Sequence, residues 1–162
     1  PDWRACAAAS CAAGLLDRAM PFGPAPAGLF DLLAETLDQL AARTPGPAFL
    51  PRFELRLLRE LGLAPDWGRC GKCRADLRGD GGARMDVAHG ALLCPACGAD
   101  RGVAVSAAAL EALRAMQGAV LPAALPERVF REVRALAGGL LEHHADLDPR
   151  ARDVAFQILA AG

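Results

Sequence analysis

Aromatic side chains are scarce in this sequence, and tyrosine is absent altogether. Phenylalanine and tryptophan together account for 5% of the 162 residues, and none of them lies between Gly68 and Arg101. Without an aromatic ring, that segment has no platform on which unpaired nucleic-acid bases could stack. Lysine is nearly missing as well, because arginine outnumbers it seventeen to one, and we attribute this bias to GC-rich codon usage rather than to a mechanism.

Long hydrophobic runs are also missing. The longest stretch without a charged residue spans residues 5–16, which is shorter than the roughly 20 apolar residues that cross a bilayer. Apolar residues still make up 53% of the chain and charged residues 23%, a balance that excludes a disordered chain. We therefore expect a soluble globular protein of about one domain that does not contact a membrane.

The chain has no excess of charge of either sign. Its net charge is −1 and its isoelectric point is near 6.4. Because affinity for phosphate groups needs a basic surface, a protein that binds nucleic acid over its whole surface is excluded, and only a local patch could do so. The first residue is Pro1, which predicts a segment of a longer protein rather than a signal peptide, since no extended basic region precedes the apolar run.

Four of the six cysteines follow the pattern C-x2-C, twenty residues, C-x2-C. This spacing is typical of a zinc site in which each C-x-x-C turn presents two thiolates to one tetrahedral ion. Glycine and proline next to both pairs favour the tight turns that such a site needs. Redox motifs and disulfides are the alternatives, and zinc is the favoured interpretation. The predicted ligands are Cys70, Cys73, Cys94 and Cys97.

We expect this zinc to be structural, because four thiolates fill the tetrahedral shell and leave no position for a reactive water. His89 lies between the two pairs and is expected to be a surface turn residue. Cys6 and Cys11, at i and i+5 on an apolar helical stretch, are expected to be buried. The sequence contains no recognisable catalytic motif, so we expect no enzymatic activity.

The segments on both sides of the cysteine motif have the apolar periodicity of helices. Before it, helices are predicted from a cap at Asp2 to about residue 20, over 27–43 and over 49–61. After it, helices are predicted from a cap at Ser106 to about residue 117, from Pro126 onwards, and from a cap at Asp148 onwards. The predicted fold is all-α, a bundle of about six helices interrupted by a small four-cysteine zinc module.

The chain is predicted to divide into residues 1–64, the first helices of the bundle, 65–105, the zinc-binding insert, and 106–162, the remaining helices. The insert is too poor in apolar residues for a core of its own, so metal binding is expected to supply much of its folding free energy. Within it, residues 87–93 suggest a short hairpin that turns at His89 and Gly90.

Several runs of this sequence resemble the C-terminal part of the RecO family of bacterial DNA repair and recombination mediators. The most specific run joins the third helix to the first cysteine pair, residues 53–66 and Cys70-Gly71-Lys72-Cys73, and residues 90–97 contain the second pair. Residues 15–18, 30–33 and 106–113 are similar to family helices on either side.

The resemblance implies a mediator of the RecF pathway that catalyses no reaction. It implies that the protein binds single- and double-stranded DNA, mainly through an N-terminal OB-fold not present in this sequence, and that it anneals complementary strands. It further implies contacts with RecR and with single-strand-binding protein, and a place in the bacterial cytoplasm with the nucleoid. Carried over by position, the zinc ligands would again be Cys70, Cys73, Cys94 and Cys97.

Two groups of basic residues are candidates for contact with DNA or a partner. Arg52, Arg56 and Arg59 recur at helical spacing, so that they could form one stripe that meets phosphates or the acidic C-terminal tail of single-strand-binding protein. A solvated stripe paired with nearby carboxylates is the alternative. The second group lies in the zinc insert, where the six basic and four acidic residues between Gly68 and Arg101 leave a charge of +2, against −3 for the rest of the chain. It includes Arg69, Lys72 and Arg74.

Two alternatives stay open at this point. His143 and His144 with Glu142 and Asp146 could suggest a metal cluster, but adjacent helical residues point about 100° apart, so a solvated helix end is expected. For the function, the alternative is a zinc-ribbon module, associated with transcription or with another protein, that binds no DNA.

Overall fold

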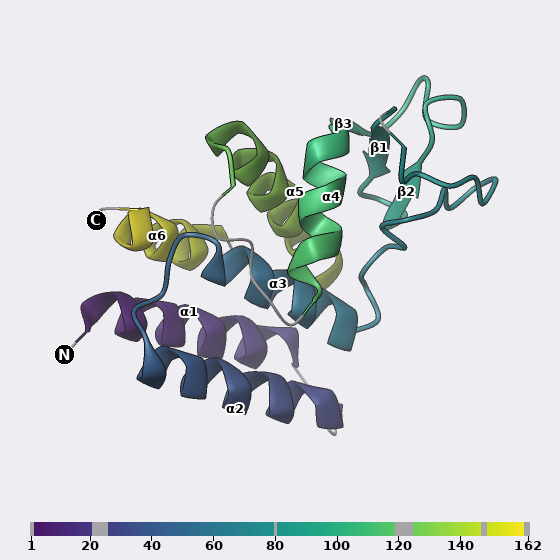
Figure 1. The fold of residues 1–162 in the computed structure, drawn as a ribbon. Helices are drawn as coiled ribbons and strands as arrows, with labels where there is room; N and C mark the ends of the chain where they lie inside the picture. Colours follow the sequence, from purple (N-terminus) through teal and green to yellow (C-terminus); the bar gives the residue numbers. More distant parts are fainter. Residues whose placement is uncertain (1, 21–25, 80, 119–124, 147–148, 161–162) are drawn as a thin grey trace.

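The computed structural model describes residues 2–20, 26–79, 81–118, 125–146 and 149–160. These residues form six helices and three short strands (Figure 1). The helices are α1 (Trp3–Ala19), α2 (Ala27–Ala42), α3 (Phe49–Glu60), α4 (Ala107–Met116), α5 (Glu127–Ala145) and α6 (Pro149–Ala160). The strands are β1 (Ala83–Asp86), β2 (Ala91–Leu93) and β3 (Val103–Val105). The predicted helices are confirmed, mostly to within two residues at their ends.

Helices α1 and α2 lie side by side and antiparallel along one edge of the bundle (Figure 1). Helix α1 begins where the Asp2 carboxylate accepts hydrogen bonds from the backbone N–H groups of Arg4 and Ala5, at 3.0 and 3.2 Å. Its buried face includes Ala8 and Ala12, whose small side chains let neighbouring helices approach closely. Because α2 has partners on one side only, the outer side of that helix stays in solvent.

Helix α3 is the central element and contacts α1, α2, α4 and α5. Nearly all of its residues are buried, including every residue from Phe49 to Leu55. A helix surrounded in this way cannot keep one face in water, and this is why polar residues on α3 lie in the interior.

Helices α4, α5 and α6 complete the bundle. Ser106 caps α4, because its hydroxyl oxygen accepts a hydrogen bond from the N–H of Ala109 at 3.2 Å, as expected from the sequence. Helix α6 packs against α1, so the two ends of the described chain lie close together (Figure 1). The predicted cap at Asp148 lies outside the described residues. None of the helices in the described ranges combines the length and the apolar character needed to cross a membrane.

Three large apolar side chains on α2 and α6 are exposed. Phe30 is 75% exposed, and Leu37 and Val154 are 44% and 55% exposed. They lie beside the buried rows of α2 and α6, and apolar periodicity alone cannot tell the edge of a buried face from its centre.

The segment between α3 and α4 contains a small antiparallel sheet with the strand order β2-β1-β3. The all-α prediction is therefore wrong in this segment, although the chain is mostly helical. The strands have only three or four residues, and β1 reads Ala-Arg-Met-Asp, which lacks the β-branched residues that would reveal a strand. The predicted hairpin begins earlier than expected, since its first strand is β1, but its turn at His89 and Gly90 is confirmed.

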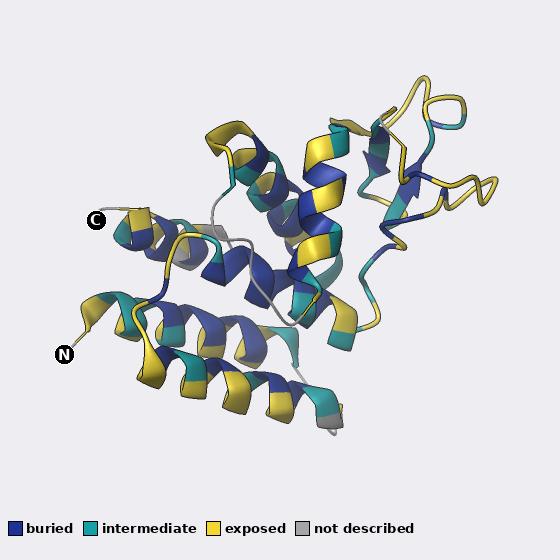
Figure 2. Ribbon diagram, in the orientation of Figure 1, coloured by how far each residue is buried: buried dark blue, intermediate teal, exposed yellow. Residues whose placement is uncertain are grey.

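The module, defined here as residues 65–105, shares the core of the bundle. Trp67, Leu77, Met85 and Leu92 are buried in the same apolar cluster as the helices. In Figure 2 the bundle interior is dark blue, whereas the loops at the outer end of the module are mostly yellow. The module therefore has one side anchored in the bundle and one side in water.

Candidate metal centre and adjoining surfaces

The four cysteines of the two C-x-x-C pairs converge at the outer end of the module. Their sulfur atoms all lie within 4.8 Å of one another, and the sulfurs of Cys73 and Cys94 are 3.8 Å apart. Four sulfurs placed tetrahedrally around zinc at about 2.3 Å would be about 3.8 Å apart. The site thus has the dimensions of a zinc tetrathiolate before any ion is considered.

Each cysteine pair lies on a similar backbone turn. The N–H of Arg74 donates to the carbonyl of Cys70 at 2.9 Å, and the N–H of Gly98 donates to the carbonyl of Cys94 at the same distance. Arg74 has a φ of 62°, a conformation that costs a non-glycine residue free energy and that the turn imposes. Two equivalent turns facing one point are the arrangement that the spacing predicted.

A hydrogen bond between the two turns fixes their distance. The N–H of Gly71 donates to the carbonyl of Leu92 at 2.7 Å, so the first turn is tied to β2, which runs directly into Cys94. A Cβ on Gly71 would come within 3.0 Å of the Cβ of Ala91. Glycine is therefore needed here for the close approach.

The backbone around the sulfurs favours thiolate at one cysteine. Burial opposes ionisation of Cys70, but the backbone N–H groups of Cys73, Cys94 and Lys72 outweigh it and lower the pKa of this thiol to about 6. Hydrogen bonds with Cys73 and Cys94 raise the pKa of Cys97 to about 12. The four sulfurs cannot all ionise beside one another unless a cation neutralises them.

The donor set fits zinc and closes its coordination shell. Zinc accepts thiolate ligands, and four cysteine sulfurs at these distances would occupy all four positions of its tetrahedral coordination shell. His89 is exposed and its Nδ1 lies 2.9 Å from an Asp86 carboxylate oxygen, as expected for a turn residue.

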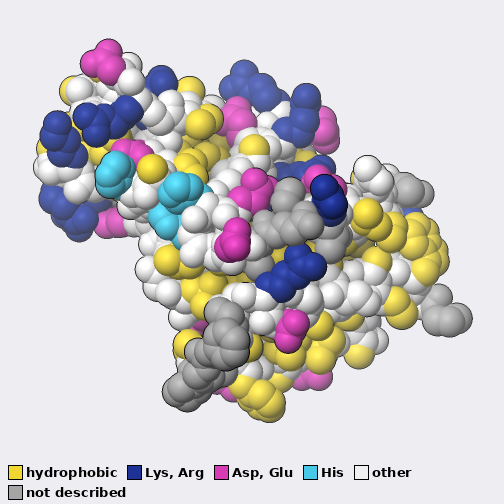
Figure 3. Space-filling view, turned by 180° about the vertical axis from the view of Figure 1, so that it is seen from behind, with side chains coloured by type: hydrophobic (Ala, Val, Ile, Leu, Met, Phe, Trp, Pro, Cys, Tyr) yellow, Lys and Arg dark blue, Asp and Glu magenta, His cyan; other side chains and the backbone are white. Residues whose placement is uncertain are grey.

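Basic side chains surround the metal centre. Arg69, Lys72 and Arg74 are exposed, and Arg74 makes an ion pair of 3.4 Å with the exposed Asp66. Figure 3 shows Lys and Arg side chains gathered at the end of the molecule that the module forms. The basic residues predicted for the module are thus exposed, at an end of the molecule where Lys and Arg side chains are frequent.

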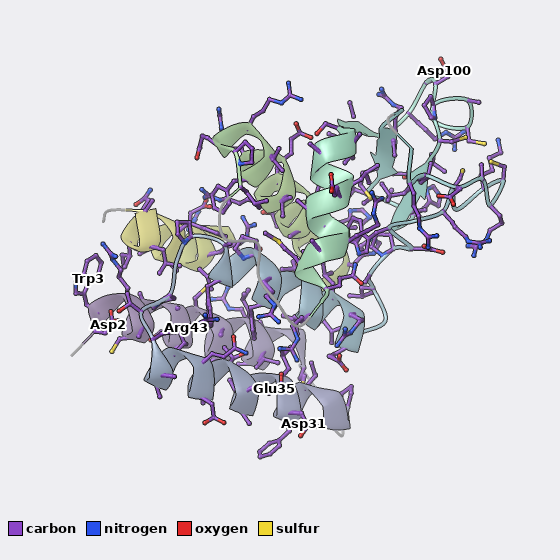
Figure 4. All side chains as sticks on the ribbon, in the orientation of Figure 1. Asp2, Trp3, Asp31, Glu35, Arg43 and Asp100 are labelled. Carbon is purple, nitrogen blue, oxygen red and sulfur yellow. The ribbon has the colours of Figure 1, made fainter. Side chains whose placement is uncertain are left out.

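The second predicted group, on α3, is not brought together on a surface. Arg52 is only 8% exposed and donates to the carbonyl of Gly118 at 3.0 Å, and burial lowers the pKa of its guanidinium. Arg56 pairs with Glu35, which α2 directs toward α3 (Figure 4), and Arg59 pairs with its neighbour Glu60. The central position of α3 covers the face that periodicity assigned to solvent.

A buried ion pair inside the bundle has no counterpart in the sequence predictions. Glu54 of α3 is fully buried and accepts two hydrogen bonds from Arg152 of α6, from Nε at 2.5 Å and from Nη2 at 3.0 Å. Burial raises the pKa of Glu54, and the hydrogen bonds from Arg152 act in the opposite direction. Nothing in the sequence distinguishes this pair from surface charges. A glutamate between two apolar residues, such as Glu54, is common on the exposed face of amphipathic helices.

A pocket of about 700 Å³ lies where the α2–α3 loop, the first half of α5 and the end of α6 meet. Its lining includes three arginines and three phenylalanines, namely Arg43, Arg131, Arg134, Phe49, Phe130 and Phe156. Glu127 also lines it and pairs with Arg131 at 3.3 Å, so the lining residues carry a net charge of +2. Arg134 also pairs with Asp153 of α6, at 2.6 Å. Arg43, labelled in Figure 4, directly follows α2. Three separate segments of the chain build this pocket, which is why no sequence motif marks it.

Two smaller predictions need correction. His143 is exposed as expected, but His144 is half-buried, and its Nε2 lies 2.7 Å from the carbonyl of Val87 in the module. The predicted solvated helix end is therefore a contact between α5 and the β1–β2 turn. Cys11 is buried, whereas Cys6 is exposed, because residues five apart on a helix lie on different faces.

In the described residues, six helices surround one core, and the attached module holds a four-cysteine cluster that could bind a metal ion, which defines a helical scaffold with a candidate metal site. Over residues 1–153 the chain matches the family described as Recombination protein O C terminal. The chain therefore belongs to the RecO family, as the resemblance in its sequence indicated.

Curated relatives agree with this assignment. The chain is 40% identical over 122 residues to the DNA repair protein RecO of Anaeromyxobacter sp. (strain K), covering 72% of this chain and 48% of that protein. It is 33% identical over 150 residues to the DNA repair protein RecO of Roseiflexus sp. (strain RS-1), covering 89% of this chain and 53% of that protein. The chain thus spans about half the length of these curated relatives. No solved structure matches it.

Proposed function

We propose that this chain is the helical, zinc-bearing part of a DNA repair and recombination mediator that works in the bacterial cytoplasm and catalyses no reaction. The observation that carries the proposal is the family match over residues 1–153. The closed set of four cysteine sulfurs supports a scaffold rather than an enzyme, because it would leave a bound metal no open position.

Cys70, Cys73, Cys94 and Cys97 would hold the zinc ion. When bound, zinc supplies a crosslink that neutralises the thiolates and joins the two turns. The turns in turn fix β2 and the basic residues around it, so the module presents a fixed surface. The direct test is metal analysis of the purified chain, with about one zinc per chain expected and its loss in a Cys94→Ser variant.

The basic surface of the module is a candidate contact for the phosphate backbone of DNA. Arg69, Lys72 and Arg74 are exposed there, and a positive surface without aromatic rings favours phosphate contact over base recognition. In the whole protein this contact would add to that of the OB-fold that the resemblance implies. A Lys72→Glu variant should weaken DNA binding and reduce its salt dependence, whereas Arg18→Glu on the exposed side of α1 should change neither. Equal effects of both substitutions would reject the patch.

The pocket beside α5 is a candidate site for the acidic C-terminal tail of single-strand-binding protein. Arg43, Arg131 and Arg134 provide cations for carboxylates, and Phe130 with Phe156 provides an apolar wall for a large side chain. This combination fits a peptide that carries both negative charge and an apolar residue. RecR is a further partner expected from the family resemblance, without an assigned surface.

Binding of a labelled tail peptide tests the pocket. An Arg131→Ala variant should weaken binding at least tenfold, which is about 1.4 kcal/mol, because it removes an exposed pocket cation. Arg59→Ala on α3 is the matched control, since it also removes an exposed arginine paired with a glutamate. Weaker binding in the control with full binding in Arg131→Ala would assign the tail to the α3 arginines instead.

A zinc-ribbon module that binds protein and no DNA is the alternative function. It predicts that the chain, joined to the rest of its protein, shows no DNA affinity at low salt. The family match favours the repair mediator.

A further inference from the structure

We propose that Arg152 is a positioning residue for this pocket, because it holds the pocket residues Arg134 of α5 and Phe156 of α6 in place. Arg152 itself is not among the described residues that line the pocket. This inference rests on the proposed function, because it concerns how the same pocket is held in a binding geometry. Its basis is the set of contacts that the Arg152 guanidinium makes in the interior of the bundle.

Arg152 contacts both pocket residues directly. Its Nη2 donates to the backbone carbonyl of Arg134 at 2.5 Å. Its guanidinium carbon lies 4.8 Å from the ring centre of Phe156, and the guanidinium carbon of Arg134 lies 4.2 Å from the same ring centre. Two guanidinium groups therefore pack on Phe156, and one of them also fixes the backbone of the other.

Glu54 makes this arrangement possible in the interior. A guanidinium buried without a counter-charge would be very costly, and the carboxylate of Glu54 offsets that cost by accepting two hydrogen bonds. The Nη2 of Arg152 also donates to the backbone carbonyl of Arg134. The pair thus links three helices, α3 through Glu54, α5 through Arg134 and α6 through Arg152 itself.

Two further features restrict Arg134 and Arg152. The Nη2 of Arg134 donates to the Asp153 carboxylate at 2.6 Å, so the residue that follows Arg152 also holds the Arg134 side chain. Gly138 leaves the space that Arg152 occupies, since a Cβ at this position would lie 2.8 Å from the guanidinium carbon. Arg134, 33% exposed, is consequently ordered before any ligand arrives.

Order of this kind raises affinity, because a side chain that is already fixed loses little freedom when a ligand binds. The proposal predicts that the pocket binds the acidic tail peptide well only while Arg152 is in place. Arg152 itself would contribute through Arg134 and Phe156, and not through contact with the peptide.

The test removes the buried pair without leaving a single charge behind. In the Glu54→Leu/Arg152→Met double variant, apolar side chains of similar volume replace the ion pair, an exchange that commonly preserves the fold. We expect the dissociation constant of the labelled tail peptide to rise about three- to tenfold, the loss expected when one ordered side chain becomes free. Leu110→Ala, a buried substitution in α4 outside the pocket lining, is the control for lost stability and should leave affinity within about twofold.

A spectroscopic readout separates positioning from general stability. The NMR signal of the Arg134 side-chain Nε–Hε group should lose its order in the double variant and keep it in Leu110→Ala. If the double variant does not fold, Gly138→Ala displaces the Arg152 guanidinium while keeping both charges, and the same rise in dissociation constant and loss of Arg134 order are expected.

The outcomes distinguish this inference from the proposed function. Wild-type affinity in the double variant, or in Gly138→Ala if that replaces it, together with weak binding by Arg131→Ala, would overturn the role of Arg152 and leave the pocket assignment standing. A peptide that does not bind the wild-type chain, or that binds Arg131→Ala equally well, would overturn both. Equal losses in the double variant and in Leu110→Ala would also overturn the positioning role.

Discussion

The helical bundle and the module differ in how many apolar side chains they bury. The bundle buries a continuous set of apolar side chains on its helices, and its central helix α3 is buried over most of its length. The module has strands of three or four residues and exposed loops, and it adds only a few side chains to the common core. We therefore expect apolar burial to be sufficient for the first region and a metal crosslink to be needed by the second.

Charge follows the same division. Residues 68–101 of the module carry a net charge of +2 and the rest of the chain −3, so a nearly neutral sequence contains a basic segment and an acidic remainder. The interior of the bundle also contains a charged pair, Glu54 and Arg152. The charged residues of the module thus lie mostly at the surface, where a partner can reach them, whereas the buried Glu54–Arg152 pair joins helices of the bundle.

Removal of the metal should have the largest effect, and it should affect the module far more than the bundle. In a Cys70→Ser variant we expect zinc to be lost and the amides of β1 to β3 to lose protection from hydrogen exchange, while the helical circular dichroism largely persists. Structural zinc contributes on the order of 10 kcal/mol to the folding of small modules, which is more than this sheet can supply otherwise. Cys6→Ser, at an exposed position on α1, is the control. Retained protection of the strands without zinc would contradict the account.

A pair of adjacent glycines on α5 tests the bundle alone. Gly138→Ala should destabilise the chain by about 1–3 kcal/mol, because the new methyl group would meet the Arg152 guanidinium. Gly139→Ala should stabilise it by up to about 1 kcal/mol, because nothing lies within 4 Å of its Cβ and alanine favours the helix. Urea unfolding measures both, and zinc content should stay unchanged. Equal effects at the two positions would show that Gly138 does not make room for Arg152.

Loss of the contact between the bundle and the module is expected to have a smaller effect on stability. His144→Ala removes the hydrogen bond to the Val87 carbonyl and should cost about 1 kcal/mol. Hydrogen exchange at the Gly90 amide, which donates to the same carbonyl, should become faster. The exposed neighbour provides the control, since His143→Ala should leave this amide unchanged. Faster exchange in both variants would point to the helix end as a whole.

The smallest expected effect concerns two cysteines of α1. Burial, and then the nearby Glu54 charge, raises the pKa of Cys11 to about 11. Because the thiolate is the reactive form, alkylation of the zinc-loaded chain at pH 8 should modify exposed Cys6 and spare Cys11. The raised pKa reduces stability only as the pH rises above the ordinary value of 9.0, so no change is expected near neutrality. Mass spectrometry that found Cys11 modified as fast as Cys6 would contradict its burial.

The parts that sequence predicted best depend on local signals. Helix ends were marked by Asp2 and Ser106 caps and by proline and glycine breaks, and the paired cysteines had a spacing with few other uses. These signals lie within a few residues of the feature they determine, so no knowledge of the tertiary fold is needed to interpret them.

The features that sequence missed depend on contacts between distant segments. The sheet could not be predicted because β1 pairs with β3 across the second cysteine turn, and β1 contains no β-branched residue. Arg52 and Glu54 looked exposed because periodicity gives one buried face, and the neighbours of α3 cover the other. The pocket combines the α2–α3 loop, α5 and α6, which no linear pattern connects.

X-ray absorption at the zinc edge of the purified chain tests the central claim most directly. The account predicts about one zinc per chain with a shell of four sulfur atoms at about 2.3 Å. A shell that includes nitrogen or oxygen in place of sulfur, or a folded chain that binds no zinc, would contradict it.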